Sequence, residues 1–333
     1  MRNILCNIGD DIVLNLGGKS EVIKLQELSN PEKISKIYRI QFSNKPQQKH
    51  LHFITNLLKD NTEIDLRFYG NYSEDSIDWQ SLSIIENLQI DLWETKELKD
   101  LIYLKNLKKL GISKNLKSTV SLNIISKLYK LEYFYTSISK DIESVENLKN
   151  LKFLSLREIK AKNIDFIIDL QNLNYVSISL GSYENIDGLT LLKNLEKLSI
   201  HQIRNFTDEQ LNSVLSNCTK LKALELQNLK SLKNLYFLKK LTELEYLFLE
   251  GNKNIKSYKT VDILKNLNIF STSNSRANDK NLEYLQNIEN VYLGDSYQKK
   301  TVINFAKTFK GRNLWIYGKE IMGKCENYNP FSI

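Results

Sequence analysis

The stretch LKNLEKLSI, residues 192–200, has an apolar spacing that neither a helix nor a strand alone explains. Its apolar residues are Leu192, Leu195, Leu198 and Ile200, so the steps are three, three and then two. An amphipathic helix keeps steps of three or four, and a half-buried strand keeps steps of two. The stretch therefore predicts a junction between a helical turn and a short strand.

The same spacing recurs along the whole chain. It appears in LKNLKKLGI from residue 104, LKNLKFLSL from 148 and LTELEYLFL from 241. Written as L-x-x-L-x-L, the unit has its fourth position at Ile40, Ile64, Leu88, Leu110, Phe134, Leu154, Val176, Leu198, Leu224, Leu247, Phe270, Val291 and Leu314. The intervals between these positions run from 20 to 26 residues. One such unit cannot bury its own apolar face, so the units are expected to stack into one array.

This pattern resembles the leucine-rich repeat. The resemblance implies an α/β solenoid with a curved parallel sheet on its concave face and short helical or 3₁₀ turns on its convex face. The LKNL units look like those of bacterial internalins. An asparagine usually follows the strand of such repeats and bonds turn backbone along the stack; it stands at Asn115 and Asn252. Other units replace it, and the units before residue 100 keep the pattern least well.

One unit is longer than the others, NFTDEQLNSVLSNCTKL at residues 205–221. Thr207 with Gln210 forms a capping-box sequence, which predicts a helix start. The apolar residues on one face of this helix are Leu211, Val214 and Leu215. The unit resembles the helix-bearing repeat of ribonuclease-inhibitor-like solenoids. Cys218 is then expected to be a buried apolar residue and not a reactive thiol.

Three segments follow from the repeats. Residues 1–33 precede the first unit, and their runs DIVLNL and EVIKLQEL around GGKS predict a β-hairpin that caps the array. Residues 34–318 hold the solenoid of about thirteen units. Residues 319–333 form a C-terminal tail, either frayed or folded over the last strand.

Cysteine usage and the apolar runs bear on the location of the chain. The cysteines, Cys6, Cys218 and Cys325, are far apart and odd in number, unlike a disulfide framework or a zinc motif. The N-terminal apolar run is too short for a signal peptide, and no run reaches the roughly 18 residues that span a membrane. We expect a cytoplasmic monomer with no membrane partner.

The sequence offers no catalytic, metal or cofactor motif. His50 and His52 stand without nearby ligands, so a solvated pair is expected rather than a metal site. Ser179, His201 and Glu225 approach one another if adjacent units align, but an open repeat sheet supplies no oxyanion hole or pocket. LGGKS at 16–20 lacks the spacing of a phosphate loop. We therefore expect no enzymatic activity and no cofactor.

A net charge of +8 raises the question of nucleic acid. On the outward strand positions the charges cancel, because five cations (Arg39, Arg67, Lys109, Arg157 and Lys197) face five anions (Glu63, Asp65, Asp91, Glu225 and Glu250). A phosphate-tracking groove along the sheet is not predicted. The basic surplus falls on the return turns and near the C-terminal end, so no nucleic-acid partner is expected.

Aromatic residues are enriched on the same outward positions. Of 39 such positions, nine are aromatic, against about four expected from 33 aromatics in 333 residues. They are Tyr133, Tyr135, Phe153, Tyr175, Tyr246, Phe248, Tyr292, Trp315 and Tyr317. Aromatics of this kind dominate protein interfaces, although strands also favour them for sheet packing alone.

The sequence thus predicts a protein-binding scaffold, such as an inhibitor, a toxin-neutralising protein or a regulatory protein, that takes a protein partner on its concave face. The alternative is a secreted or surface adhesin, or a host-directed effector, of the internalin type. A missing secretion signal argues against an adhesin, and the short tail leaves no room for the catalytic domain of a ligase effector.

Overall fold

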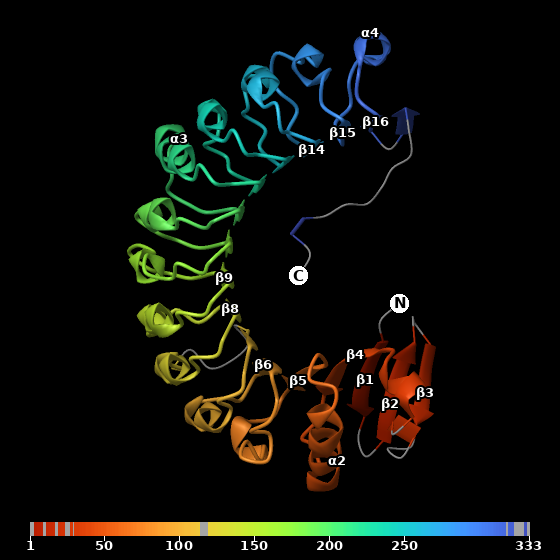
Figure 1. Cartoon of the computed structure of the whole chain (residues 1–333), viewed down its shortest axis with the longest axis vertical. Helices are drawn as coiled ribbons and strands as arrows, with labels where there is room; N and C mark the ends of the chain where they lie inside the picture. Colours follow the sequence, from red (N-terminus) through yellow and green to blue (C-terminus); the bar gives the residue numbers. More distant parts are fainter. Residues whose placement is uncertain are drawn as a thin grey trace. The chain divides into compact units, whose positions relative to one another are not determined.

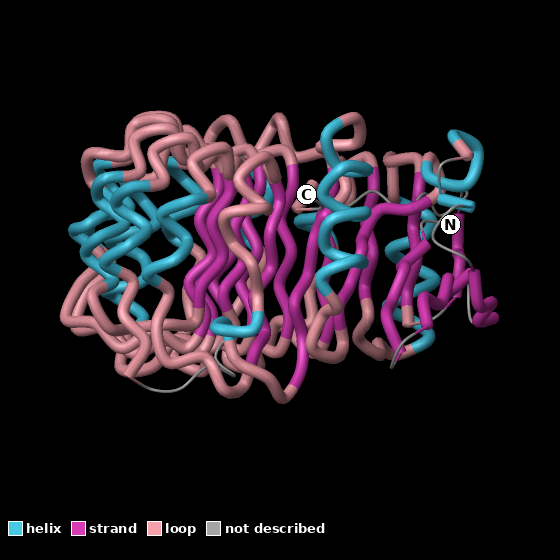
Figure 2. Tube along the Cα trace, turned by 90° about the horizontal axis from the view of Figure 1, so that it is seen from below, coloured by secondary structure: helices cyan, strands magenta, loops and turns pink. Residues whose placement is uncertain are grey.

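The computed structural model describes residues 3–8, 11–16, 19–23, 27, 28, 30–113, 119–317, 319–322, 330 and 331. The chain divides into two compact units, Met1–Leu154 and Ser155–Ile333. Within each unit, strands line one side and helical segments line the other, and the strand side is concave (Figure 1). Figure 2 shows the strands running side by side, with the helical segments in a separate layer.

The first unit opens with three antiparallel strands, β1 (Asn3–Ile8), β2 (Asp11–Leu16) and β3 (Lys19–Ile23). Parallel strands follow: β4 (Ile37–Phe42), β5 (Asp65–Gly70), β6 (Asn87–Leu92), β7 (Lys109–Ile112) and β8 (Tyr133–Thr136). The connections carry α1 (Pro31–Ile34), α2 (Gln48–Lys59), and the 3₁₀ turns η2 (Glu74–Ser76), η3 (Lys99–Tyr103), η4 (Asn123–Lys127) and η5 (Ile142–Asn147). The hairpin expected near the N-terminus is β2–β3. Strand β1, which pairs with both β2 and β4, was not predicted.

The boundary between the units falls within β9 (Phe153–Arg157). The second unit continues with the parallel strands β10 (Tyr175–Ser179), β11 (Lys197–His201), β12 (Ala223–Gln227), β13 (Tyr246–Glu250), β14 (Ile269–Ser273), β15 (Asn290–Leu293) and β16 (Asn313–Ile316). β17 (Lys319–Met322) pairs antiparallel to β16, so these tail residues fold against the last repeat strand. Its helical segments are η6 (Asp165–Ile167), η7 (Asp187–Leu191), α3 (Asp208–Asn217), η8 (Tyr236–Lys240), η9 (Lys259–Ile263), η10 (Glu283–Leu285) and α4 (Lys299–Thr308).

The fourth positions of the repeat stack on one another in the core. Val176, Leu198, Leu224 and Leu247 are paired in register on consecutive strands, and each side chain has 0% exposure. The residues two positions later in these strands, such as Ile200 and Leu226, are buried in the same way. The apolar step of two therefore places both residues inward, and stacking of neighbours closes the core, as predicted.

The predicted register is wrong in the second repeat. β5 aligns Leu66, not Ile64, with Ile40 of β4 and with Leu88 of β6. Ile64 is also buried, but it precedes the strand. The outward positions of β5 are consequently Asp65, Arg67 and Tyr69, so Glu63 is not on the sheet face and Tyr69 is.

The prediction for His50 is also wrong. His50 has 3% exposure, because residues 48–59 form the helix α2, which the sequence analysis did not identify. His50, Ile54 and Leu58 recur every four residues and face the core together, whereas His52 is exposed. The two histidines therefore do not form a solvated pair.

The longer repeat has the predicted helix. The Thr207 side chain accepts from the backbone N–H of Gln210, and the Gln210 side chain accepts in return from the backbone N–H of Thr207. The buried face contains Leu211, Val214 and Leu215. Cys218 has 5% exposure, and burial raises the pKa of its thiol to about 12, which keeps it unreactive.

Asparagine side chains link successive repeats in two ways. Asn252, wholly buried, accepts from the backbone N–H of Leu229 and donates to the carbonyl of Leu226, which is the role expected of the asparagine after the strand. Asn115 lies outside the described residues. A second series was not predicted: in four of the five L-K-N triplets the asparagine donates to a backbone carbonyl one repeat earlier, whereas Asn234 of the fifth donates to the Asp208 carboxylate. The four bonds to carbonyls are Asn106 to Ser83 (3.0 Å), Asn150 to Tyr129 (2.8 Å), Asn194 to Gln171 (2.7 Å) and Asn266 to Thr242 (2.9 Å).

Candidate partner-binding face

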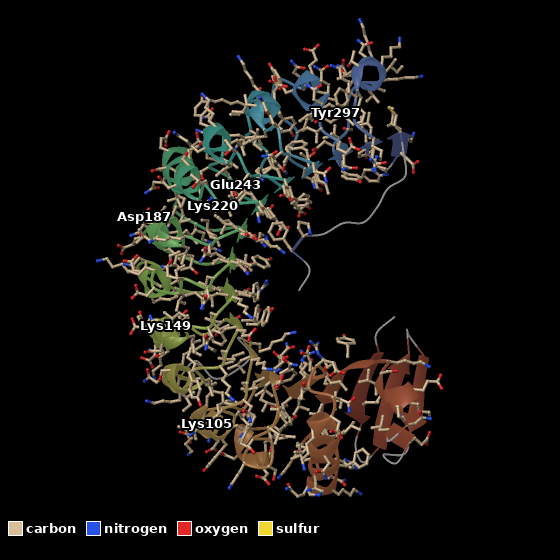
Figure 3. The ribbon with its side chains drawn as sticks, in the orientation of Figure 1. Lys105, Lys149, Asp187, Lys220, Glu243 and Tyr297 are labelled. Carbon is tan, nitrogen blue, oxygen red and sulfur yellow. The ribbon has the colours of Figure 1, made fainter. Side chains whose placement is uncertain are left out.

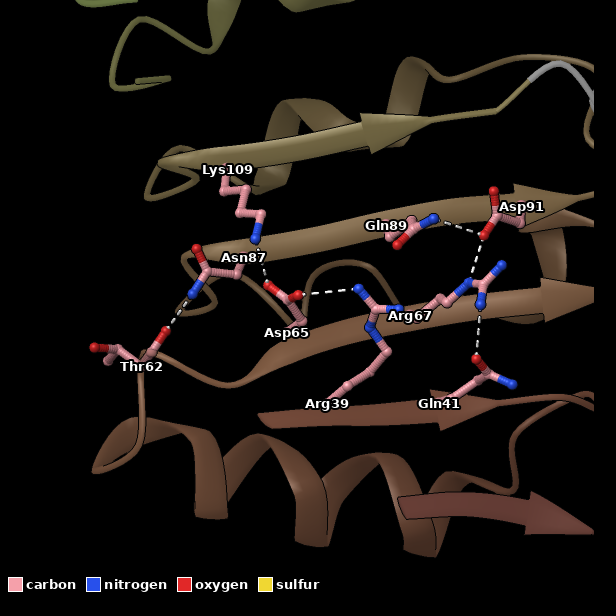
Figure 4. A network of polar contacts seen from close by, with 9 residues as sticks. All are labelled: Arg39, Gln41, Thr62, Asp65, Arg67, Asn87, Gln89, Asp91 and Lys109. Carbon is pink, nitrogen blue, oxygen red and sulfur yellow. Dashed lines mark hydrogen bonds and ion pairs between the residues drawn. The ribbon is translucent and has the colours of Figure 1, made fainter. Parts of the chain in front are cut away.

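The concave face consists of the outward strand positions, and on β4–β7 it carries a network of polar contacts (Figure 4). The Arg67 Nε donates to Asp91 Oδ2 at 2.5 Å, and the Arg67 Nη1 donates to Gln41 Oε1 at 3.0 Å. Gln89 also donates to Asp91, whose side chain is only 4% exposed. The buried Asp91 carboxylate is therefore paired with a cation and hydrogen-bonded.

A second ion pair group lies at the start of the same strands. Asp65 accepts from Arg39 at 3.1 Å, and its other oxygen lies 3.3 Å from the Lys109 Nζ. Asn87 donates beside it to the Thr62 carbonyl. Cations and anions of β4–β7 thus bond to each other, although without Glu63 on the face three cations meet two anions here and the predicted cancellation is incomplete.

Aromatic residues of the first unit occupy two places on its concave face. The rings of Tyr133 and Phe153 lie 6.4 Å apart, with Tyr135 two residues along β8 from Tyr133, and all three are half-buried. The sequence analysis missed Tyr69, because of the register error in β5. Its ring stacks edge-on to Trp93 at 6.0 Å and lies 4.7 Å from the Arg67 guanidinium.

The other predicted aromatics lie in the second unit. Tyr175, Tyr246, Phe248, Tyr292 and Trp315 are half-buried on outward strand positions, and Tyr292 is paired in register with Trp315. Tyr317 follows β16 and is 64% exposed. The structure thus places eight of the nine predicted residues, counting those of the first unit, on half-buried outward positions of strands.

Residues 330 and 331 contact the concave face of the second unit. The ring of Phe331 lies 5.5 Å from that of Tyr175 and 5.7 Å from that of Tyr246. Between these two tyrosines, the register places Lys197 on β11 and Ala223 on β12. The Lys197 Nζ donates to the carbonyl of Pro330 at 2.7 Å. We call Tyr175, Lys197, Ala223 and Tyr246 the aromatic slot.

The small side chain of Ala223 makes room for a ring in the aromatic slot. Neighbouring strands lie about 4.8 Å apart, so the three steps from β10 to β13 separate the tyrosine backbones by about 14 Å. A ring pair takes up about 4.5–7 Å between centroids, so one ring fits between the two tyrosines. Ala223, with a single methyl group, leaves room for that ring, and Phe331 fills it.

Burial changes the acidity of both tyrosines in the slot. Desolvation raises the pKa of Tyr246 to about 12, and the negative charge of Glu225 adds to the effect. The same two causes raise the pKa of Tyr175 well above its ordinary value. Glu225 itself accepts from the Ser199 hydroxyl at 2.8 Å and from the Gln227 amide at 2.5 Å. The two tyrosines of the slot therefore stay neutral, and the nearby Glu225 carboxylate is hydrogen-bonded to Ser199 and Gln227.

A hollow of about 600 Å³ adjoins the slot at the starts of β11–β16. Tyr246, Lys197 and Pro330 line it together with Tyr292. Its charged lining residues are Glu196, Lys197, Lys222, Glu245, Glu289 and Arg312, among which Lys222 pairs with Glu196 at 2.8 Å and Arg312 with Glu289 at 2.9 Å. The hollow is mixed in charge and continuous with the aromatic surface.

The side chains of His201 and Glu225 bond to different neighbours. The His201 Nε2 lies 3.2 Å from the amide nitrogen of Asn228, whereas Glu225 bonds Ser199 and Gln227. Among the residues that the structure describes, no group of three or more His, Cys, Asp or Glu side chains could hold a metal ion. None of the helices in these described residues has the length and apolar content of a membrane span.

The helical side of each unit carries exposed charge (Figure 3). Lys105 and Lys149 lie there in the first unit, and Asp187 in the second, whereas Lys220 and Glu243 lie between the helical layer and the strands. Lys220 and Glu243 form a 2.9 Å ion pair between consecutive repeats. Exposed lysines also stand on α4 and beside it, at Lys299, Lys300, Lys307 and Lys310. These basic residues lie on connections, as predicted, and not on the strands.

Comparison with known proteins identifies the fold. No family model matches the sequence, and no curated protein is significantly similar to it. Among solved structures, an internalin (inlF) of Listeria monocytogenes matches with a TM-score of 0.56 and 19% identity, over 82% of this chain and 76% of that one. Internalin C2 of the same organism matches over 54% of this chain and 77% of its own, with 22% identity and a TM-score of 0.42. The Toll–Spatzle complex of Drosophila matches over 87% of this chain and 47% of that one, with 14% identity and a TM-score of 0.46.

TM-scores below 0.5 do not establish a common fold, so the assignment rests on the first match and on the architecture. Parallel strands at intervals of one repeat, helical and 3₁₀ connections on one side, and asparagines that bond from repeat to repeat are the features of a leucine-rich-repeat solenoid. The chain has the leucine-rich-repeat solenoid fold, which it shares with an internalin.

Proposed function

We propose that this protein is a non-enzymatic scaffold that binds a protein partner on the concave faces of its repeats. The observation that carries the proposal is the aromatic surface, because half-buried tyrosine, phenylalanine and tryptophan side chains occupy outward positions from β8 to β16. Such side chains offer large contact areas at a small entropic cost and are the residues that dominate protein interfaces.

The polar network of the first unit fits the same function. Its arginines and carboxylates are already bonded to one another, so they present a defined surface of donors and acceptors instead of a field of like charge. Paired groups of this kind contribute specificity more than affinity. The aromatic residues are therefore proposed to anchor the partner, and the network of β4–β7 to select it.

The role as an inhibitor, a toxin-neutralising protein or a regulatory protein belongs to this proposal, since each acts by covering a partner's surface. The cytoplasmic location and the monomeric state expected from the sequence remain predictions. So do the limits of the N-terminal cap, the solenoid and the tail.

Photo-crosslinking in the source cells tests the proposal in each unit separately. A photoreactive amino acid replaces Tyr135 or Phe248 on the concave side, or Lys149 or Asp187 on the helical side. We expect the two concave positions to capture the same protein, and the two helical positions to capture none of it. Capture from the helical positions with silence from the concave ones would overturn the proposal.

A further inference from the structure

The aromatic slot holds a short peptide segment by two kinds of contact. Two tyrosine rings, from β10 and β13, enclose the ring of Phe331. The ammonium group of Lys197 binds the carbonyl of Pro330, the residue before it. One set of groups therefore recognises a side chain and another recognises the adjacent backbone, as in sites that bind peptides.

The segment that fills the slot is far from it in sequence. Phe331 is 156 residues from Tyr175 and 85 residues from Tyr246 (331 − 175 and 331 − 246). It lies outside the repeats, and it is not part of the stacked apolar core. Its contact with the repeat strands is made on the concave side, where the predicted partner-binding residues lie (Figure 1).

We propose that the aromatic slot is a subsite for an aromatic side chain of the protein partner, and that Phe331 occupies the slot until the partner displaces it. This inference rests on the proposed function and adds the chemistry of the partner to it. The partner presents an exposed aromatic residue, and the carbonyl before that residue accepts from Lys197. The segment flanking it then enters the hollow at the starts of β11–β16, which Pro330 lines here.

The intramolecular ligand sets a threshold for the partner. Seven residues separate Met322, the end of β17, from Pro330. A ligand tethered by a short linker has an effective concentration on the order of millimolar. A single aromatic residue cannot overcome this competition, whereas a partner that also binds other parts of the concave face can. The tail would therefore select for extended partners.

A labelled peptide tests the slot directly. The probe is fluorescein-NYNPFSI, with the sequence of residues 327–333, and the control probe is NYNPASI, which lacks the ring. Fluorescence anisotropy measures the binding of each probe to the full chain and to its Phe331→Ala variant. We expect Phe331→Ala to bind the NYNPFSI probe at least tenfold more tightly than the unmodified chain does, and to bind NYNPASI weakly.

Further variants assign the contacts. In the Phe331→Ala background, Tyr246→Ala and Lys197→Met should each weaken binding of the NYNPFSI probe by tenfold or more. Tyr236→Ala is the matched control, because Tyr236 is an exposed tyrosine on η8 and not on a strand, and it should bind as before. Lys197→Met removes one donor and no ring, so it still tests the slot if Tyr246→Ala does not fold.

Equal binding of the NYNPFSI probe to the unmodified chain and to Phe331→Ala would overturn the inference, as would equal binding of the two probes. These outcomes are separate from those of the crosslinking experiment. Concave capture without an effect of Phe331→Ala removes the slot and keeps the proposed function. Tighter probe binding by Phe331→Ala without concave capture shows that the slot binds an aromatic peptide, but it removes the protein partner and with it the proposed function.

Discussion

The buried amide of Asn252 joins two repeats, because its oxygen accepts from the backbone N–H of Leu229 at 2.8 Å. The nitrogen of the same amide donates to the carbonyl of Leu226 at 2.7 Å, and the backbone N–H of Asn252 is bonded by the Ser275 hydroxyl at 2.9 Å. One side chain thus satisfies backbone groups of the preceding repeat that water cannot reach.

Replacement of Asn252 should destabilise the second unit. Asn252→Ala leaves a buried N–H and a buried carbonyl without their side-chain partner, and each unsatisfied group costs about 1–3 kcal/mol. Urea denaturation measures the loss of unfolding free energy. Asn254→Ala is the control, because Asn254 is exposed and water can replace its bond to the Lys230 carbonyl. Equal losses for the two variants would contradict the structural role of Asn252.

Leu198, a core residue of the stretch LKNLEKLSI, gives a second prediction. Leu198 has 0% exposure, so Leu198→Ala should open a cavity and cost about 2–5 kcal/mol. Since each repeat is stabilised by its neighbours, the melting transition should also become less cooperative. Calorimetry measures both effects. Leu191→Ala in the same repeat removes a side chain that is 56% exposed, and it should leave the transition nearly unchanged.

Paired aromatic substitutions distinguish binding from sheet packing. Tyr135→Ala with Phe153→Ala, or Phe248→Ala with Trp315→Ala, should leave folding nearly intact, because these side chains lie on the concave face and not in the core. Binding of the crosslinked partner should fall at least tenfold for each pair in use, since interface anchors cost roughly 2 kcal/mol or more on truncation. Calorimetric titration measures the affinity.

Lysine-to-alanine changes at Lys105 and Lys149 on the helical side serve as controls for the aromatic pairs, and they should bind normally. If the aromatic variants bind as well as the unmodified chain, these residues act only as strand formers.

Alkaline pH should lower the folding stability of the second unit. An unfolded phenol has a pKa near 10, and burial raises that of Tyr246 to about 12 in the folded chain. A raised folded pKa contributes stability that is complete below about pH 10 and is lost as the pH rises toward 12, because the unfolded chain ionises first. Phe331→Ala should uncover Tyr246 and lower its pKa. Ultraviolet titration of phenolate formation measures this shift, with Tyr246→Phe to assign the signal; identical titrations would count against the contact.

The strand positions of the later repeats could be predicted from sequence because the spacing of the helical turn and the spacing of the strand meet at one residue there. In LEKLSI, a step of three precedes a step of two, and only one alignment places Leu198 and Ile200 in the core. In EIDLRF of the second repeat, Ile64, Leu66 and Phe68 alternate without such a marker, so a shift by two keeps an apolar face inward. The pairing with β4 and β6 decides the register, and that information is not local.

The candidate site was predictable only in part. Outward positions follow from the register, so eight of the nine aromatics lie where they were expected, whereas Tyr69 was lost with the error in β5. The contact of Phe331 had no signal in the sequence, because the repeat period does not extend to it. Helix α2 was missed because its apolar residues overlap the expected return turn, which led to the error at His50.

The asparagines of the L-K-N triplets give the array a direction. Asn106, Asn150, Asn194 and Asn266 all donate toward the N-terminus, to a carbonyl that was synthesised about one repeat earlier. On the ribosome, each new triplet therefore emerges when the turn that holds its acceptor has already been synthesised, and no bond of this series waits for a later segment. We expect the nascent chain to gain order one repeat at a time, so that stalled chains ending after whole repeats are progressively protected from proteases.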